Sequence, residues 1–442
     1  MFFEGRFVPF RMVIVCAASL CALLLLTLLS ARQSPVQQFE IALNPYGTAP
    51  LAAICELRSW KELKVERVVI EGIDSFELPN ASFSREHTFP ILGLRPDRTQ
   101  VVRVEARDKD GRVVYCPSTE ITTAPLPTDF PVRVALTVNP RIKGVVFCQL
   151  ESDDSAYQVV LNVFGDVVWY RPIRPGARLS RVLDDGTLES LELRQGVLVF
   201  EELTGRQVRT SKLALQDLSQ DLSGFLSADT LWTQRGQSLL FLNLTNGRVV
   251  PLELSGLLGP VPVSSLSRGL TPTSLLFTIE GHDVLGEWDY ATQHADWAVG
   301  KELSWSAGRS SSYLTVAPPE APISPLRAMW TQNGGLMTVE SESDGLALRE
   351  YFVDLKTAQM KRNWSEPVLA GKSLESVSLS ESFQDGLLIL GINLSASGAA
   401  SEVRIQELGQ SAEGKVLLDL QIKGDKKWRV GPIQKLSSLY GS

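Results

Sequence analysis

The sequence predicts an all-β protein with an N-terminal transmembrane helix, a small β-sandwich and a six-bladed β-propeller. Three observations support this prediction: an uncharged apolar stretch near the N-terminus, short alternating strands up to about residue 123, and polar turns that recur after residue 145. A chain of 442 residues has room for two or three domains. The expected parts are a cytoplasmic tip and anchor (1–35), the sandwich (36–124), a linker (125–144) and the propeller (145–442).

Residues 12–30 form the expected transmembrane segment. The run MVIVCAASLCALLLLTLLS is uncharged over 19 residues, which is long enough to span a bilayer. Arg6 and Arg11 precede it and place the N-terminus in the cytoplasm, although Arg32 weakens this bias. The alternative is a cleavable signal peptide, but its apolar region is usually shorter, and no small-x-small site follows Leu29. We expect an uncleaved single-pass anchor with most of the chain extracytoplasmic.

Composition and spacing exclude several classes of function. The formal charge is −7, and Lys and Arg are scattered without a run, so a nucleic-acid partner is not expected. No Cys or His spacing suits a metal ion, and no glycine-rich loop leads from a strand into a helix. No Ser/His/Asp arrangement is recognisable either. We therefore expect neither a metal nor a cofactor.

Three cysteines lie beyond the anchor: Cys55, Cys116 and Cys148. At most one intrachain disulfide can form among them in an oxidising compartment. We expect it to join Cys55 to Cys116, because both occupy strand-like positions of the same small sandwich. The alternative is that all three are buried thiols.

The sandwich is predicted from four alternating runs, APLAAICEL, KVERVVIEG, HTFPILGL and TQVVRVEARDKDGRVVYC. Short alternating strands separated by turns are typical of a small antiparallel sandwich. Asp108–Gly111 predicts a hairpin, because Asp and Gly tolerate the positive φ that such turns require. Ala124–Pro131, APLPTDFP, contains three prolines that cannot donate to a ladder, so it predicts an interdomain linker.

The propeller is predicted from polar turns followed by apolar strands. The clearest repeat pairs DTLWTQRGQSLLFL with RAMWTQNGGLMTV, in which Trp232 and Trp330 are 98 residues apart. Most turns precede a second hairpin, such as VLVFEELTGRQVRTS, so each unit holds about four strands. Six units average about 50 residues, which matches one blade. A seven-bladed ring or an open β-array is the alternative, because the spacing is uneven. The turns lie near residues 186, 236, 272, 334 and 386, and a sixth unit begins at LESDDSAYQVVLN.

Several short motifs resemble bacterial periplasmic arylsulfate sulfotransferases. NPYGTAPLAA, PILGL and the hairpin VVRVEARDKDGRVV resemble the N-terminal β-sandwich of that family. GVVFCQLESDDSAYQVVLNVFGDVVWYRP resembles the first blade of its six-bladed propeller, and Trp428–Gly441 resembles its closing segment. The resemblance covers nearly the whole predicted ectodomain, and it implies a periplasmic location in a bacterium.

The resemblance also gives NPYG, within residues 44–53, a structural role. The motif is then a turn and not a site. Pro45 and Pro50 would fix the backbone of the strand that leads in, and Gly47 would adopt a conformation that other residues resist.

The chemistry that the resemblance implies needs histidines. Those enzymes pass a sulfuryl group between phenols through a sulfated histidine in the propeller channel, assisted by further histidines and an arginine. This chain has three histidines. His87 belongs to the sandwich and His294 to an outer hairpin. His282, between the second and third strands of the fourth unit, is the one candidate nucleophile, and a simple Gly-His-Asp turn is the alternative. We expect a catalytically inactive ligand- or partner-binding protein; a divergent arylsulfate sulfotransferase is the alternative.

A ligand site is predicted at the mouth of the propeller channel. The strands expected nearest the axis are RLSRVL, DTLWTQ, SLSRGL, PLRAMW and ESVSLS. Their cationic and aromatic side chains suit an aryl or sulfated small molecule. Alternatively, the tryptophans pack between blades and the arginines pair with acids. The expected partners are thus the membrane and either such a molecule or a protein. The candidate residues are Arg178, Arg181, Trp232, Arg268, Arg327 and Trp330.

Overall fold

A computed structural model describes the chain from Pro35 to Tyr440, apart from a number of short segments. The residues outside the description are 1–34, 72–73, 79–81, 140–142, 177, 184, 193–196, 213–221, 228–229, 236–237, 245–247, 254–262, 280–282, 293, 301–314, 317–324, 332–333, 343–344, 358, 371–373, 382–386, 395–401, 410–415 and 441–442. The chain forms two compact units. The first comprises the chain up to Ala42, Ile54–Phe89 and Gln100–Ile121, and the second comprises Leu43–Ala53, Pro90–Thr99 and Thr122–Ser442.

The first unit is the predicted β-sandwich. Its central path runs β1-β2-β5-β6, with β3 and β4 pairing with β2 and β7 pairing with β5. The long β2 has 18 residues whose exposure alternates along most of its length, which places one of its faces in the core. The strands are β1 (Val36–Leu43), β2 (Ala53–Ile70), β3 (Asp74–Glu77), β4 (Ser84–Ile91), β5 (Thr99–Asp108), β6 (Val113–Tyr115) and β7 (Thr119–Thr122).

The hairpin predicted at Asp108–Gly111 joins β5 to β6. Gly111 N donates to Asp108 O at 3.0 Å. The Asp108 carboxylate Oδ1 also accepts from the backbone N of Asp110 at 3.0 Å and of Arg112 at 2.9 Å. The Asp side chain therefore stabilises the turn that its sequence position predicts.

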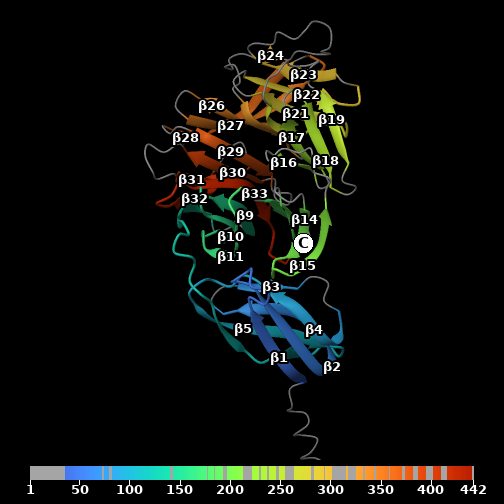
Figure 1. Ribbon diagram of the computed structural model, residues 1–442, viewed down its shortest axis with the longest axis vertical. Coiled ribbons are helices and arrows are strands. Elements are labelled where there is room, and N and C mark those ends of the chain that lie inside the picture. Colours follow the sequence, from blue (N-terminus) through green and yellow to red (C-terminus); the bar gives the residue numbers. More distant parts are fainter. Residues whose placement is uncertain are drawn as a thin grey trace, which may run out of the picture. The chain divides into compact units, whose positions relative to one another are not determined.

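The second unit is a six-bladed β-propeller, so the predicted blade number is confirmed (Figure 1). Each blade is a sheet of four or five strands. Blade 1 consists of β33 (Arg429–Leu436), β9 (Val145–Glu151), β10 (Ala156–Asn162) and β11 (Val167–Ile173). Blade 2 consists of β12 (Arg178–Val182), β13 (Thr187–Glu192), β14 (Val197–Glu202) and β15 (Gln207–Lys212). Blade 3 consists of β16 (Leu222–Ser227), β17 (Thr230–Arg235), β18 (Ser238–Asn243) and β19 (Val249–Glu253).

The remaining three blades follow the same plan. Blade 4 consists of β20 (Val263–Arg268), β21 (Ser274–Ile279), β22 (Val284–Asp289) and β23 (His294–Val299). Blade 5 consists of β25 (Pro325–Trp330), β26 (Leu336–Glu342), β27 (Gly345–Asp354), β28 (Gln359–Ala370) and β24 (Thr315–Val316). Blade 6 consists of β29 (Leu374–Glu381), β30 (Leu387–Leu394), β31 (Glu402–Gly409), β32 (Val416–Lys423) and β8 (Val132–Val138).

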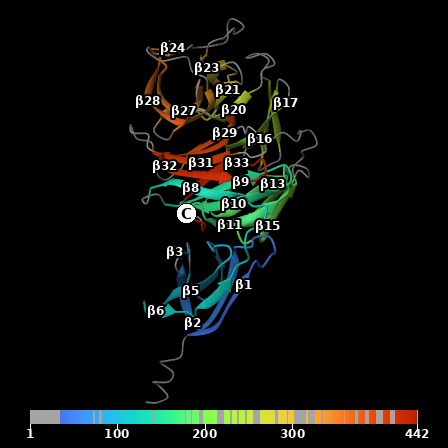
Figure 2. The same cartoon turned by 90° about the vertical axis from the view of Figure 1, so that its left-hand side faces the viewer.

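The ring closes through two strands that are remote in sequence from their neighbours. β33 is the innermost strand of blade 1 and pairs with β9, so the segment beginning at Trp428 does close the propeller. β8 adds a fifth, outermost strand to blade 6 by pairing with β32 (Figure 2). The predicted linker, residues 125–144, therefore contains a propeller strand, and its alternating VRVALTV pattern is the reason.

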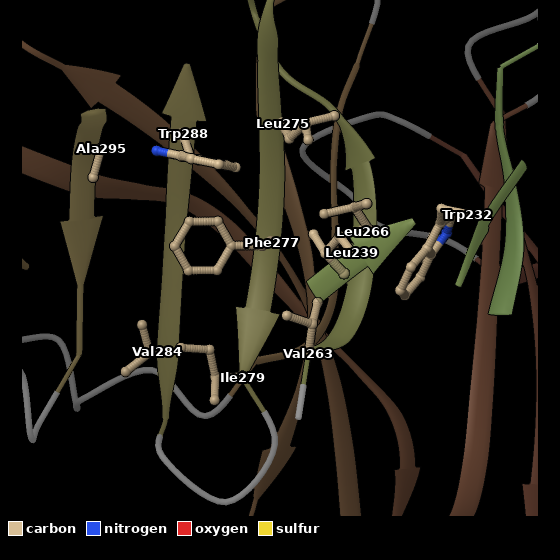
Figure 3. Packing of buried hydrophobic residues seen from close by; sticks show 10 residues of the cluster. All are labelled: Trp232, Leu239, Val263, Leu266, Leu275, Phe277, Ile279, Val284, Trp288 and Ala295. Atoms are coloured by element: carbon tan, nitrogen blue, oxygen red, sulfur yellow. The ribbon is translucent and has the colours of Figure 1, made fainter. Parts of the chain in front are cut away.

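The apolar layers between adjacent blades form the core. One layer joins blade 3 to blade 4 and includes Trp232, Leu239, Val263 and Phe277 (Figure 3). Similar layers separate blades 4 and 5 and blades 5 and 6. A single blade leaves both of its faces exposed, so stacking in a ring is what buries them.

The NPYG motif is a turn, as the sequence predicts. Gly47 has a φ of 72°, a region that side-chain-bearing residues seldom adopt, and its N donates to Asn44 O at 3.0 Å. The Asn44 side chain also accepts from Ala49 N at 3.1 Å. The turn belongs to the second unit, where Thr48 packs directly against Gly205 of blade 2.

Among the described residues there is no helix with the length and apolarity to cross a membrane. The predicted span at residues 12–30 lies outside those residues. The anchor therefore stays a prediction from the sequence.

Candidate functional site

The propeller axis is lined by the innermost strand of each blade. These strands are β33, β12, β16, β20, β25 and β29. Contacts between them join β33 to β12, and also run from β16 through β20, β25 and β29 to β33. Four of the five strands expected near the axis are indeed innermost: RLSRVL, SLSRGL, PLRAMW and ESVSLS. The fifth, DTLWTQ, was wrongly placed. It is β17, the second strand of blade 3, because the turn after it joins strands two and three.

Trp232 consequently lies away from the axis. It is 5% exposed and packs between blade 3 and blade 4, close to Val263 and Leu266 (Figure 3). Its role in the structure is that of a core residue. The match with Trp330 in the sequence compares a second strand with an innermost strand, which explains the uneven repeat spacing.

Trp330 is at the end of the innermost strand β25. Its ring meets that of Trp297 edge to face, with centroids 6.1 Å apart and an angle of 82°. Its Nε1 is buried and has no hydrogen-bond partner among the residues that the structure describes. Trp330 is half-buried and packs against the apolar layer between blades 4 and 5.

Two of the candidate arginines have partners within the propeller. Arg181 of β12 donates from Nε to Glu189 Oε2 at 2.6 Å, and burial raises the pKa of Glu189 despite this cation. Arg327 of β25 donates from Nε to Val377 O at 2.9 Å, which ties blade 5 to blade 6. The Arg181 contact agrees with the alternative interpretation, in which the arginines pair with acids. The Arg327 contact with a backbone carbonyl was not expected from the sequence.

The other two arginines differ from these. Arg268, the last residue of β20, is exposed to solvent. Arg178 begins β12, but its side chain is outside the description. In every blade from the second onward, the innermost strand starts an antiparallel meander of four strands, so this strand begins at one face of the ring and ends at the other. Arg178 and Arg268 therefore occupy opposite ends of the channel, and the six candidates do not share one mouth.

The three histidines are separated. His87 is on β4 of the sandwich, with Nε2 3.0 Å from Ser84 O. His294 starts β23, the outermost strand of blade 4, as the sequence predicts. His282 is outside the described residues, between β21 and β22. No described residue of an innermost strand is a histidine.

Side-chain amides of one blade bind backbone groups on the innermost strand of the next blade. Gln434 of β33 donates to Val182 O at 2.7 Å and accepts from Val182 N at 3.0 Å, on β12. Asn393 of β30 makes the same pair with Val430 of β33, at 2.9 and 2.6 Å. An innermost strand has an edge without a strand neighbour, so these amides satisfy backbone groups that would be unpaired.

Blades 1 and 2 enclose buried polar side chains that the sequence analysis did not single out. Gln149 and Gln158 face each other across β9 and β10. The Gln158 amide donates to Ser180 Oγ at 2.5 Å and to Ser190 Oγ at 3.3 Å. The Oε1 atoms of both glutamines have no hydrogen-bond partner among the described residues. The signal in the sequence is a single glutamine within each of the apolar runs VVFCQLE and AYQVVLN.

The same interface contains a buried ion pair. Arg171 of β11 and Glu201 of β14 form two hydrogen bonds, and their side chains are 8% and 6% exposed. A buried pair of this kind contributes little net stability, because desolvation offsets the attraction. It does fix how the two blades face each other. Within the described part of the chain, no cluster of His, Cys, Asp or Glu is placed to hold a metal ion.

Residues 40–124 match the arylsulfotransferase Ig-like domain. No curated protein matches the chain in sequence. Among solved structures, the chain is similar to a quinonprotein alcohol dehydrogenase-like protein from Bacteroides thetaiotaomicron, with 10% sequence identity and a TM-score of 0.35. The match covers 86% of this chain and 94% of that chain. The Cps50 (Swd1) β-propeller domain of Myceliophteria thermophila is also similar, with 10% identity, 70% and 92% coverage, and a TM-score of 0.35.

A further similarity is to a chain of a nidogen/laminin complex, with 10% identity. It covers 66% of this chain and 99% of that chain, with a TM-score of 0.39.

Proposed function

We propose that this chain, an arylsulfotransferase-like protein with the family's Ig-like domain and a six-bladed β-propeller, binds a ligand or partner without transferring sulfuryl groups. We further propose that it is anchored in a membrane by residues 12–30, with both units on the extracytoplasmic side.

The distribution of histidines is the observation that carries this proposal. Sulfuryl transfer through a covalent intermediate needs a nucleophile at the site where the donor binds. Of the three histidines, His87 is on the sandwich and His294 is on an outermost strand. The described innermost strands offer serine, arginine and tryptophan instead.

The charges near the axis support binding better than turnover. A transferring sulfuryl group needs cations aimed at its oxygens in the transition state. Arg181 is held by Glu189, and Arg327 by a carbonyl of the next blade. Arg268 is exposed and leaves a positive charge at one end of the channel. A weak complex with an aryl sulfate is compatible with this arrangement and needs no catalysis.

The second candidate is a divergent arylsulfate sulfotransferase that uses His282. The observation that favours it is the position of this residue between β21 and β22. In an antiparallel meander that starts inside, loops between second and third strands lie on the same face as the start of each innermost strand. The ends of β21 and β22 that the segment containing His282 joins therefore lie at a face of the ring that opens onto the channel.

An assay with the full chain separates the two candidates. The chain is incubated with an aryl sulfate donor and a phenol acceptor, and released phenol and any covalent sulfuryl adduct are measured by absorbance and mass spectrometry. We expect neither product nor adduct. Turnover that disappears in His282→Ala and persists in the control His87→Ala would make the chain an enzyme. Turnover that survives both substitutions would also refute the proposal.

A further inference from the structure

One end of the sandwich lies where the chain would leave a membrane. Pro35 is the first described residue, and its carbonyl accepts from Trp60 N at 3.1 Å. The apolar stretch ends at Ser30, so residues 31–35 connect it to this point. Five extended residues reach at most about 18 Å. The headgroup layer on one side of a bilayer is about 5–8 Å thick. If residues 12–30 span a membrane, the Trp60 end of the sandwich is therefore at its surface.

Trp60 has the exposure and the neighbour of an interfacial tryptophan. It is 45% exposed, and the Lys61 Nζ lies 4.9 Å from its ring centroid. Tryptophan is enriched at membrane–water interfaces because its ring is apolar and its N–H is polar. A neighbouring lysine can lay its apolar stem along the ring and keep its ammonium group among lipid phosphates.

The charge around Trp60 suits lipid headgroups. Ser59 Oγ donates to the backbone O of Lys61 at 2.5 Å and of Arg85 at 3.4 Å, so both cations lie on this end. Two acids next to these cations in sequence have cationic partners, since Glu62 pairs with Lys109 and Glu86 pairs with Arg58. The hydrogen bond from Lys109 lowers the pKa of Glu62, and the charge of Arg85 makes a smaller contribution.

Lys61 and Arg85 are both exposed, and the salt bridges that Glu62 and Glu86 form are with other cations. They supply the positive charge that phosphate groups would meet. A single exposed tryptophan flanked by cations also differs from the broad apolar patch that a protein partner would need.

We propose that the Trp60 end of the sandwich, formed by Trp60, Lys61 and Arg85, rests on the extracytoplasmic surface of the membrane. Trp60 enters the headgroup layer, and Lys61 and Arg85 contact lipid phosphates. This proposal depends on the anchoring proposed above, which brings the surface within reach of the bilayer.

The full chain in nanodiscs tests this contact. The discs contain phosphatidylcholine and phosphatidylglycerol, with and without phosphatidylcholine spin-labelled on its headgroup. The label quenches only those of the nine tryptophans that lie in the headgroup layer. We expect Trp60→Phe to lose most of the label-dependent quenching. The matched control Trp364→Phe, at a half-buried position on β28 of the propeller, should keep it.

Charge reversal provides a second measurement. Lys61→Glu combined with Arg85→Glu should reduce the quenching of Trp60, because the anionic headgroups then repel this end of the sandwich. Equal quenching in the wild type and Trp60→Phe would overturn the contact while leaving the anchor intact. A chain that does not stay in the discs would overturn the anchor and the contact together, so the two failures are distinguishable.

Discussion

Cys55, Cys116 and Cys148 are buried free thiols in the structure, where the disulfide predicted between Cys55 and Cys116 is not formed. Burial raises the pKa of each thiol to about 12. The charge of a Cys116 thiolate would raise the pKa of Cys55 further, which indicates that these two thiols are near each other. Since thiolates are the reactive form, the folded protein should oxidise slowly, and a disulfide would have to form during folding.

Non-reducing peptide mapping tests the disulfide after expression in an oxidising compartment. We expect three unmodified thiols, because all three cysteines are free and buried in the fold. A bond between Cys55 and Cys116 would instead support the pairing that the sequence predicts. A bond involving Cys148 would contradict both interpretations.

Asp129 is the centre of a polar cluster within the second unit. It accepts from Ser155 and, at 2.7 Å, from the Tyr157 hydroxyl, while Lys426 Nζ lies 3.4 Å away. Hydrogen bonds from Ser155 and Tyr157, with a smaller contribution from Lys426, lower the pKa of Asp129. Lys426 also binds Asp154 at 2.9 Å, so the cluster joins the segment before β8 to the connection before β33.

The lowered pKa of Asp129 makes a pH-dependent contribution to stability. Its ordinary pKa is about 3.9, and the folded value is below this, so ionisation favours the folded state. The stabilisation is present at neutral pH and is lost as the pH falls through the folded pKa. We expect Asp129→Asn to lower the free energy of unfolding by about 1 kcal/mol at pH 7, and by less at pH 3.

Denaturant unfolding at pH 7, 5 and 3 measures this difference. Asp425→Asn is the control, because Asp425 is exposed beside Lys426. It should change stability by less than about 0.5 kcal/mol. If the free energies of unfolding of the wild type and Asp129→Asn differ more at low pH than at pH 7, the lowered pKa of Asp129 is contradicted.

At the scale of elements, the turn between β14 and β15 is shaped by the NPYG segment. Gly205 has a φ of 91°, and a Cβ built there would lie 2.1 Å from Thr48 Oγ1. Gly334, in the turn between β25 and β26, has a φ of 77° with open space around it. Both glycines have a positive φ that other residues seldom adopt, but only Gly205 has a side chain, that of Thr48, where a Cβ would lie.

This difference predicts unequal effects of alanine. Gly334→Ala should cost about 1 kcal/mol from backbone strain alone. Gly205→Ala should cost more, since it also collides with Thr48. In the double variant Gly205→Ala with Thr48→Ala, part of the extra loss should be recovered, which a double-mutant cycle by thermal or denaturant unfolding will measure. If the effects of Gly205→Ala and Thr48→Ala on stability are additive, the alanine at 205 does not clash with Thr48.

The elements differ in how well the sequence predicts them. Turns that a local residue determines, such as Asp108–Gly111 and Gly47, were predicted, because their chemistry is within a few residues. Innermost strands followed by a polar turn were predicted too. β16 was missed because the Trp232 repeat pointed to the next strand. The positions of β8 at the outer edge of blade 6 and of β33 at the inner edge of blade 1 were not predicted in full, because strand partners remote along the chain leave no local pattern.

The candidate site shows the same limit. Sequence reasoning found the arginines of β12, β20 and β25, whose strands it identified. It could not find that Arg181 pairs with Glu189, or that Arg327 binds a carbonyl of the next blade. Those partners depend on register across strands and on blade stacking. The glutamines between blades 1 and 2 were missed because a polar residue within an apolar run looks the same whether it faces solvent or another blade.

At the scale of the whole molecule, the anchoring proposed for residues 12–30 would determine where the protein acts. We expect the chain to sediment with membranes and to resist extraction by high salt and by alkaline carbonate, because the uncharged, mostly apolar stretch of 19 residues buries enough surface for stable insertion. Fractionation followed by immunoblotting and N-terminal sequencing measures this. A soluble mature form that begins near Gln33 would show a cleaved signal peptide instead.

Blade 1 cannot be completed until β33 has been made. β9 ends at Glu151 and β33 begins at Arg429, so 277 residues are synthesised between the two partners. At roughly 5–20 residues per second, this interval lasts roughly 14–55 s. Throughout it the inner edge of β9 has no partner, and such an edge is a template for pairing with other chains. A growing chain therefore depends on protection of that edge during synthesis, and its native ring forms only after most of the polypeptide has emerged.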